Sequence, residues 1–149
     1  MMDRLLKLKG IVAYAVFVVI DLTCAAAGMG VPIFCILLGF FVGWYIARRV
    51  TVISANPNIK VVLERILVHT VATSLFTFIV MSAVWGSVVP MLFDPHPDFA
   101  SFGIPLILYD PKLSFIGWLV LMIFISPFLQ VLTTVFGSHV TLLVWSRRH

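Results

Sequence analysis

Four long apolar segments dominate the chain. If successive segments cross a membrane in opposite directions, nine of the ten lysine and arginine residues lie at segment ends on the same side of it. Basic residues gather on the cytoplasmic side of membrane helices. The asymmetry therefore predicts four membrane crossings with both termini in the cytoplasm, and only Lys112 on the external side. The nine are Arg4, Lys7, Lys9, Arg48, Arg49, Lys60, Arg65, Arg147 and Arg148.

The proportion of apolar residues indicates that lipid is the main solvent of this protein. Hydrophobic residues make up 62% of the 149 positions and charged residues 11%, whereas soluble domains carry about 25% charged residues. We therefore expect a multi-pass protein of the cell membrane, with the lipid bilayer as its first partner. Because the basic residues flank apolar segments, they are explained by topology and by headgroup contacts, and nucleic acid is not an expected partner.

Glycine, proline and capping residues divide the chain into helices. One helix from Gly10 to Ala47 would be about 57 Å long, almost twice the ~30 Å hydrocarbon core, so a turn is expected at Gly28–Pro32. Asn56-Pro57 and Asp110-Pro111 indicate further helix starts, and Pro127 should kink the last helix. The sequence predicts one all-α integral membrane domain over residues 1–149, with transmembrane helices at about 10–27, 32–47, 57–89 and 112–145 and a long external loop at 91–111.

Asp21 is the most conspicuous charged residue because it interrupts the first apolar segment. It lies about 16 Å along a helix from Gly10, and a carboxylate at such depth costs at least ~2.5 kcal/mol unless it is protonated or partnered. Polar residues recur at helical spacing on the third and fourth segments. We expect Asp21, Gln130, Thr73 and Thr77 to form an intramembrane polar site. This carboxyl would either bind a proton or cation or fix the packing of the helices.

His69 and His139 form a second candidate site in the cytoplasmic halves of the third and fourth segments. Two imidazoles on facing helices could bind a b-type haem or a metal ion, or relay protons. The alternative is that each histidine bonds to nearby hydroxyl groups. The sequence does not identify a cofactor.

The external segment Asp94-Pro95-His96-Pro97-Asp98 could present three side chains to a cation. Alternate residues of an extended, proline-stiffened segment point the same way, so Asp94, His96 and Asp98 could converge. The alternative is a solvated loop with capping aspartates.

Small residues recur every four positions on the second segment, at Cys35, Gly39, Gly43 and Ala47. Such a stripe lets another helix backbone approach closely, and it predicts helix packing. The stripe does not show whether the partner helix belongs to this chain or to another.

The familiar hydrolase, ATPase and thiol-oxidase motifs are missing from the sequence, so no catalytic residue is assigned and enzyme activity is not favoured. The leading hypothesis is a transport-related or accessory membrane subunit that acts as a homo-oligomer or with other membrane subunits. One alternative is a non-catalytic interaction or assembly subunit. The other is a haem- or metal-binding membrane redox protein that uses His69 and His139.

Overall fold

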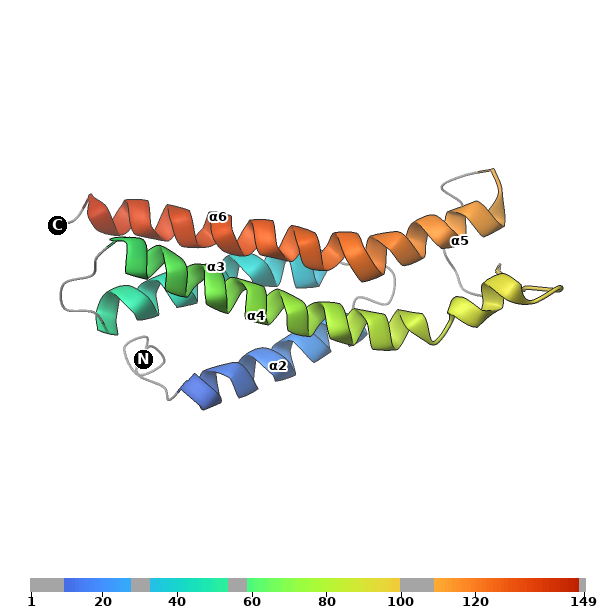
Figure 1. Cartoon of the computed structure of the whole chain (residues 1–149), viewed down its shortest axis with the longest axis horizontal. Coiled ribbons are helices and arrows are strands. Elements are labelled where there is room, and N and C mark those ends of the chain that lie inside the picture. Colours follow the sequence, from blue (N-terminus) through green and yellow to red (C-terminus); the bar gives the residue numbers. More distant parts are fainter. Residues whose placement is uncertain (1–9, 28–32, 54–58, 100–108, 148–149) are drawn as a thin grey trace.

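The computed structural model describes residues 10–27, 33–53, 59–99 and 109–147, and these parts of the chain contain helices and no strand. The all-α fold predicted from the sequence is therefore confirmed. In chain order the elements are α2 (Gly10–Ala27), α3 (Ile33–Ile53), α4 (Ile59–Gly86), the 3-10 segment η1 (Val89–Phe93), α5 (Pro111–Val120), the π segment η3 (Leu121–Ile125) and α6 (Ser126–Ser146) (Figure 1).

Three helical runs are long and apolar enough to cross a membrane. They are Ile33–Val52, Ile59–Gly86 and the continuous run Pro111–Ser146 formed by α5, η3 and α6. The helix α2 is also apolar but has 18 residues, which corresponds to about 27 Å against a hydrocarbon core of ~30 Å. By length and composition, the protein fits a membrane environment.

The helix boundaries differ from the expected ones mainly in α3. This helix does not end at Ala47 but continues to Ile53, so Arg48 and Arg49 are helical residues rather than a helix end. The helix α4 ends at Gly86, and the 3-10 segment η1 follows it. The turn expected at Gly28–Pro32 and the helix start at Asn56-Pro57 lie outside the described residues, as do Arg4, Lys7, Lys9 and Arg148.

The last helical run begins and bends where the sequence indicates. The Asp110 carboxylate accepts hydrogen bonds from the backbone N–H groups of Lys112 at 2.7 Å and Leu113 at 3.2 Å, which confirms the expected cap. The ribbon bends between α5 and α6 (Figure 1). There the Ser126 N–H donates to the Leu121 carbonyl across a π turn that directly precedes Pro127. The wider turn accommodates a proline that lacks a donor and crowds the preceding turn.

The glycines of the small-residue stripe bring α3 directly against α6. A Cβ atom at Gly39 would lie 2.8 Å from the carbonyl oxygen of Gln130, and one at Gly43 would lie 2.8 Å from the backbone nitrogen of Ser138. The side chains of Cys35 and Ala47 are buried in the same stripe. The helix that packs on this stripe is therefore α6 of the same chain.

Interhelical hydrogen bonds reinforce this close approach. The Thr133 hydroxyl donates to the Ile36 carbonyl at 2.8 Å, and the Ser138 hydroxyl donates to the Gly43 carbonyl at 3.0 Å. On the reverse side of the contact, Gly137 lies against the backbone of Phe40. These backbone contacts require glycine at the crossing, because any side chain would push the helices apart.

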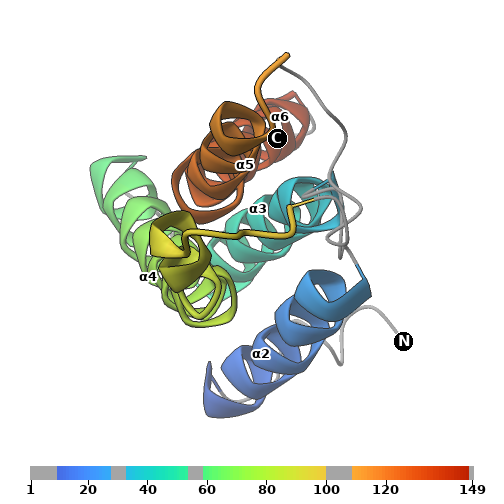
Figure 2. The ribbon, with the colours of Figure 1, turned by 90° about the vertical axis from the view of Figure 1, so that its right-hand side faces the viewer.

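The helix α2 lies at the edge of the molecule. Figure 2 shows α5 and α6 at one side, α3 and α4 in the middle and α2 at the other side. The C-terminal end of α3, the N-terminal end of α4 and the C-terminal end of α6 lie at the same end of the molecule (Figure 1). There α3 and α4 share a core of Ile46, Ala47, Val50, Val62 and Ile66.

Candidate functional site

The Asp21 carboxyl is completely buried where α2, α4 and α6 meet. Its exposed fraction is 0%. Its Oδ1 atom accepts hydrogen bonds from the Thr77 hydroxyl at 3.0 Å and from Nε2 of Gln130 at 3.3 Å. The structure thus brings together three of the four residues that the sequence analysis assigned to an intramembrane polar site, from three different helices.

Thr73, the fourth residue of that expected site, does not bond to the carboxyl. Its hydroxyl lies 3.0 Å from the carbonyl oxygens of both His69 and Thr70, one turn earlier in the same helix. Thr73 lies one turn from Thr77 and lines a cavity described below. It therefore lies between this cavity and the Asp21 cluster, which consists of Asp21, Thr77 and Gln130.

Several buried polar side-chain atoms of α2, α4 and α6 lack a hydrogen-bond partner. Within the described residues, Oδ2 of Asp21 and Oε1 of Gln130 accept no hydrogen bond, and the buried hydroxyls of Thr70, Ser74 and Ser126 make none. No lysine, arginine or histidine in that part of the chain pairs with the carboxyl. Buried polar atoms are usually paired. The unpaired carboxyl oxygen of Asp21 has the chemistry to hold a proton or to be one ligand of a monovalent cation.

The π turn belongs to the same helical run as Gln130 and lies about one turn before it. It ends at Ser126, whose side chain is fully buried four residues before Gln130. π turns inside α-helices occur frequently at functional sites.

His69 and His139 do not face each other. His69 shares a hydrogen bond of 2.5 Å with the Tyr14 hydroxyl, and the two rings lie 5.8 Å apart. His139 is exposed on α6, on the outward face that also carries Leu132, Phe136 and Leu143. The expected pair for a haem or metal ion is therefore split between an internal contact with α2 and the outer surface of α6.

The external segment at 94–98 makes a local turn. The backbone N–H of His96 donates to Oδ1 of Asp94 at 2.9 Å, as in a turn stabilised by aspartate. Among the residues that the structure describes, Asp94, His96 and Asp98 do not form a group able to hold a metal ion.

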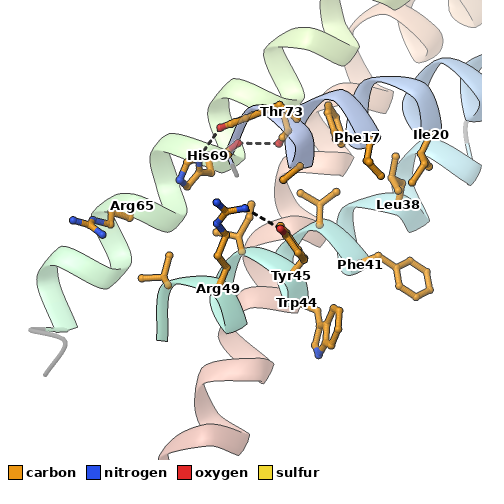
Figure 3. Close-up of a pocket in the computed structure, with 17 residues that line it drawn as sticks. Phe17, Ile20, Leu38, Phe41, Trp44, Tyr45, Arg49, Arg65, His69 and Thr73 are labelled. Carbon is orange, nitrogen blue, oxygen red and sulfur yellow. Dashed lines mark hydrogen bonds between the residues drawn. The ribbon is translucent and has the colours of Figure 1, made fainter. Parts of the chain in front are cut away.

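A cavity of about 450 Å³ separates α2 from α3 and the first half of α4 (Figure 3). Its walls are mostly apolar, and include Phe17, Ile20, Leu38 and Phe41. The hydrophilic side chains are few, and all but Thr73 gather where the basic ends of α3 and α4 approach each other. They are Tyr14, Tyr45, Arg49, Arg65 and His69.

Arg49 lies across the polar end of this cavity. Its Nη1 donates to the Tyr45 hydroxyl at 2.9 Å, and its guanidinium lies 5.9 Å from the centroid of the Tyr45 ring. Figure 3 shows the guanidinium directed towards His69. The sequence predicts for Arg49 only a role as a topology marker. A signal was present, because Tyr45 and Arg49, like Arg65 and His69, are four residues apart and so share one helix face.

Comparisons with protein-family models, with curated proteins and with solved structures gave no match. A function must then be argued from the geometry of specific groups. Two features of this chain provide such groups: the buried carboxyl of Asp21 with its partners, and the cavity between α2, α3 and α4.

Proposed function

We propose that the chain is a transport-related membrane subunit in which Asp21 binds and releases a proton or a monovalent cation. The observation that carries this proposal is a fully buried carboxyl with one oxygen bonded to two neutral donors and the other unpaired. The subunit would act as an oligomer or within a larger complex of the cell membrane.

The energetic cost of the charged carboxyl favours a bound ion. An ionised aspartate at the centre of a membrane helix costs about 2.5 to 3.5 kcal/mol, and an interhelical hydrogen bond returns about 0.6 kcal/mol. The bonds from Thr77 and Gln130 therefore leave roughly 2 kcal/mol of the cost uncompensated. A proton or cation on the unpaired oxygen would remove this cost, so the site would be loaded at rest.

In the proposed topology α2 crosses the membrane in addition to the three longer helical runs, which gives four spans. The end of the molecule that carries Arg49, Arg65 and Arg147 faces the cytoplasm. The C-terminal end of α3, the N-terminal end of α4 and the C-terminal end of α6 lie at the same end of the molecule (Figure 1), and these three residues belong to those helix ends. Their common location supports this orientation, because basic residues prefer the cytoplasmic side. Asp21 then lies closer to the external surface than His69 does.

The assembly-subunit alternative draws no support from the small-residue stripe of α3. The stripe that includes Gly39 and Gly43 is covered by α6 of the same chain, so it is not free to dock another protein. The redox alternative required His69 and His139 on facing surfaces, and the structure places them on different faces.

The decisive experiment compares Asp21→Asn with the wild-type protein. Asparagine keeps the shape and one acceptor oxygen, but it cannot bind a proton or carry a charge. Infrared difference spectra of the protein in nanodiscs, recorded from acid to alkaline pH and with Na⁺ or K⁺, should contain a carboxyl signal that Asp21→Asn removes. Asp94→Asn, the same change in the external segment, is the matched control. Proton and cation uptake into proteoliposomes is measured in parallel.

The proposal fails if no carboxyl signal assigned to Asp21 responds to pH or to either cation. It also fails if Asp21→Asn leaves ion uptake at the wild-type rate. In both cases the carboxyl would serve only to fix the packing of α2.

A further inference from the structure

We infer that the cavity between α2, α3 and α4 binds an anionic phospholipid, with an acyl chain along the apolar walls and the phosphate at Arg49 and Arg65. This site is separate from the ion-binding carboxyl, and it does not depend on the function proposed for Asp21.

The size of the cavity fits the part of an amphiphile that lies between helices, such as an acyl chain. Its volume of about 450 Å³ lies within the roughly 300 to 1,000 Å³ typical of ligand sites.

The distribution of polar groups in the cavity also points to an amphiphile. Phe17, Ile20, Leu38 and Phe41 line the apolar part, and the exposed side chains of Ile20 and Phe41 leave it open to the surroundings of the helices. The polar side chains gather at one end, apart from Thr73 at the inner wall. A ligand with an apolar tail and a single polar head matches this division.

The charge at the polar end selects an anion as the head group. Arg49 bonds to the Tyr45 hydroxyl through one nitrogen, which leaves other guanidinium donors for a ligand. In the described part of the chain neither Arg49 nor Arg65 pairs with a carboxylate. Glu64 lines the smaller neighbouring cavity and not this one.

The position of these groups identifies the source of the anion as a lipid. Arg65 and His69 belong to both cavities, so the polar end is continuous with the surface of α4. The guanidinium fork matches phosphate geometry, and basic pockets between membrane helices are known to hold anionic headgroups. An acyl chain in the apolar part would hold the phosphate at this end.

The test measures lipid binding by native mass spectrometry of the detergent-solubilised protein. Phosphatidylglycerol is the anionic probe and phosphatidylcholine the zwitterionic comparison. Arg49→Gln should weaken phosphatidylglycerol binding about tenfold, equivalent to about 1.4 kcal/mol. Arg48→Gln is the matched control, because this adjacent arginine of α3 has the same charge but does not line the cavity. It should leave binding within about twofold of the wild type.

A second variant keeps the test informative if Arg49→Gln folds poorly. Ala13→Phe adds a large side chain to the lining of the cavity and leaves both arginines in place, so it should also abolish tight phosphatidylglycerol binding. The inference is overturned if the two lipids bind equally, or if Arg48→Gln and Arg49→Gln weaken binding equally. It is also overturned if Ala13→Phe has no effect, or if inorganic phosphate displaces the lipid completely, which would indicate a site for a free anion.

Discussion

Gly43→Ala should separate α3 from α6 and destabilise the whole protein. The added Cβ would lie 2.8 Å from the backbone nitrogen of Ser138 and 2.9 Å from the carbonyl carbon of Thr134, and it would clash with the Thr134 carbonyl oxygen. Ordinary contact begins near 3.4 Å. Because all three atoms belong to the backbone of α6, no side-chain rotation can relieve the overlap, and the helix itself must move.

The magnitude follows from the contacts that this movement breaks. Overpacking of a tight contact costs about 1 to 3 kcal/mol. A shift of about an ångström would stretch the 3.0 Å bond from Ser138 to the Gly43 carbonyl beyond hydrogen-bonding distance, at a further cost of about 0.6 kcal/mol. We therefore expect a loss of about 2 to 4 kcal/mol. At about 2 to 4 °C per kcal/mol, the melting temperature should fall by roughly 5 to 15 °C.

Gly117→Ala provides a matched control with the opposite sign. Gly117 lies within α5, and an added Cβ there would meet nothing within 4 Å. Alanine should therefore stabilise the helix by about 0.5 to 1 kcal/mol. Thermal unfolding in one detergent, followed by circular dichroism, compares the two variants with the wild type. If Gly43→Ala melts at or above the wild-type temperature, the close backbone contact between α3 and α6 is refuted. Loss of an oligomer at unchanged stability would also refute it.

Further substitutions test three individual contacts. Thr77→Val removes a donor to the buried Asp21 carboxyl and should lower the free energy of unfolding in SDS by about 0.6 to 1.7 kcal/mol. Thr73→Val leaves the bonds of that carboxyl intact and should lower it by less. Equal losses of stability would contradict this assignment. Tyr14→Phe and His69→Ala each break the hydrogen bond between α2 and α4. A double-mutant cycle should give a coupling free energy of about 0.5 to 1.5 kcal/mol. Additive effects of the two substitutions would show that the bond contributes nothing to stability. Asp110→Ala removes two hydrogen bonds to backbone N–H groups at the start of α5 and should lower the free energy of unfolding by about 1 kcal/mol. A hydrogen-exchange experiment should find faster exchange in the first turn of α5 only.

The sequence contained enough information for the helices and for the partners of Asp21. Apolar length and the Asp110-Pro111 pair are local signals, and a carboxyl in a membrane helix must find donors on neighbouring helices, which left Thr77 and Gln130 among few choices. The side chain of His139 could also have been placed, because it follows Ser138 by one residue and so lies about 100° from the inward polar stripe.

The cavity and the partner of the glycine stripe could not be derived in the same way. Gly39 and Gly43 specify a close contact, but local spacing does not show which helix fills it. Arg49 borders the cavity because α3 continues past Ala47 and because α2 diverges from α3, and both depend on packing between distant parts of the chain. A charge at the end of an apolar segment indicates orientation whether or not it also borders a binding site.

The π turn before Pro127 keeps one face of the last helical run directed inward along its length. The buried residues of this run recur every four positions, at Ser114, Trp118, Met122, Ser126, Gln130, Thr134 and Ser138. An ideal helix rotates about 40° past a full circle at each such step, so a straight α-helix would carry this face gradually outward. The wide turn takes up part of that rotation. Deleting one residue from Leu121–Ile125 would turn α5 by about 100° relative to α6, which would swing Trp118 out of the interior while Gln130 stayed beside the buried carboxyl.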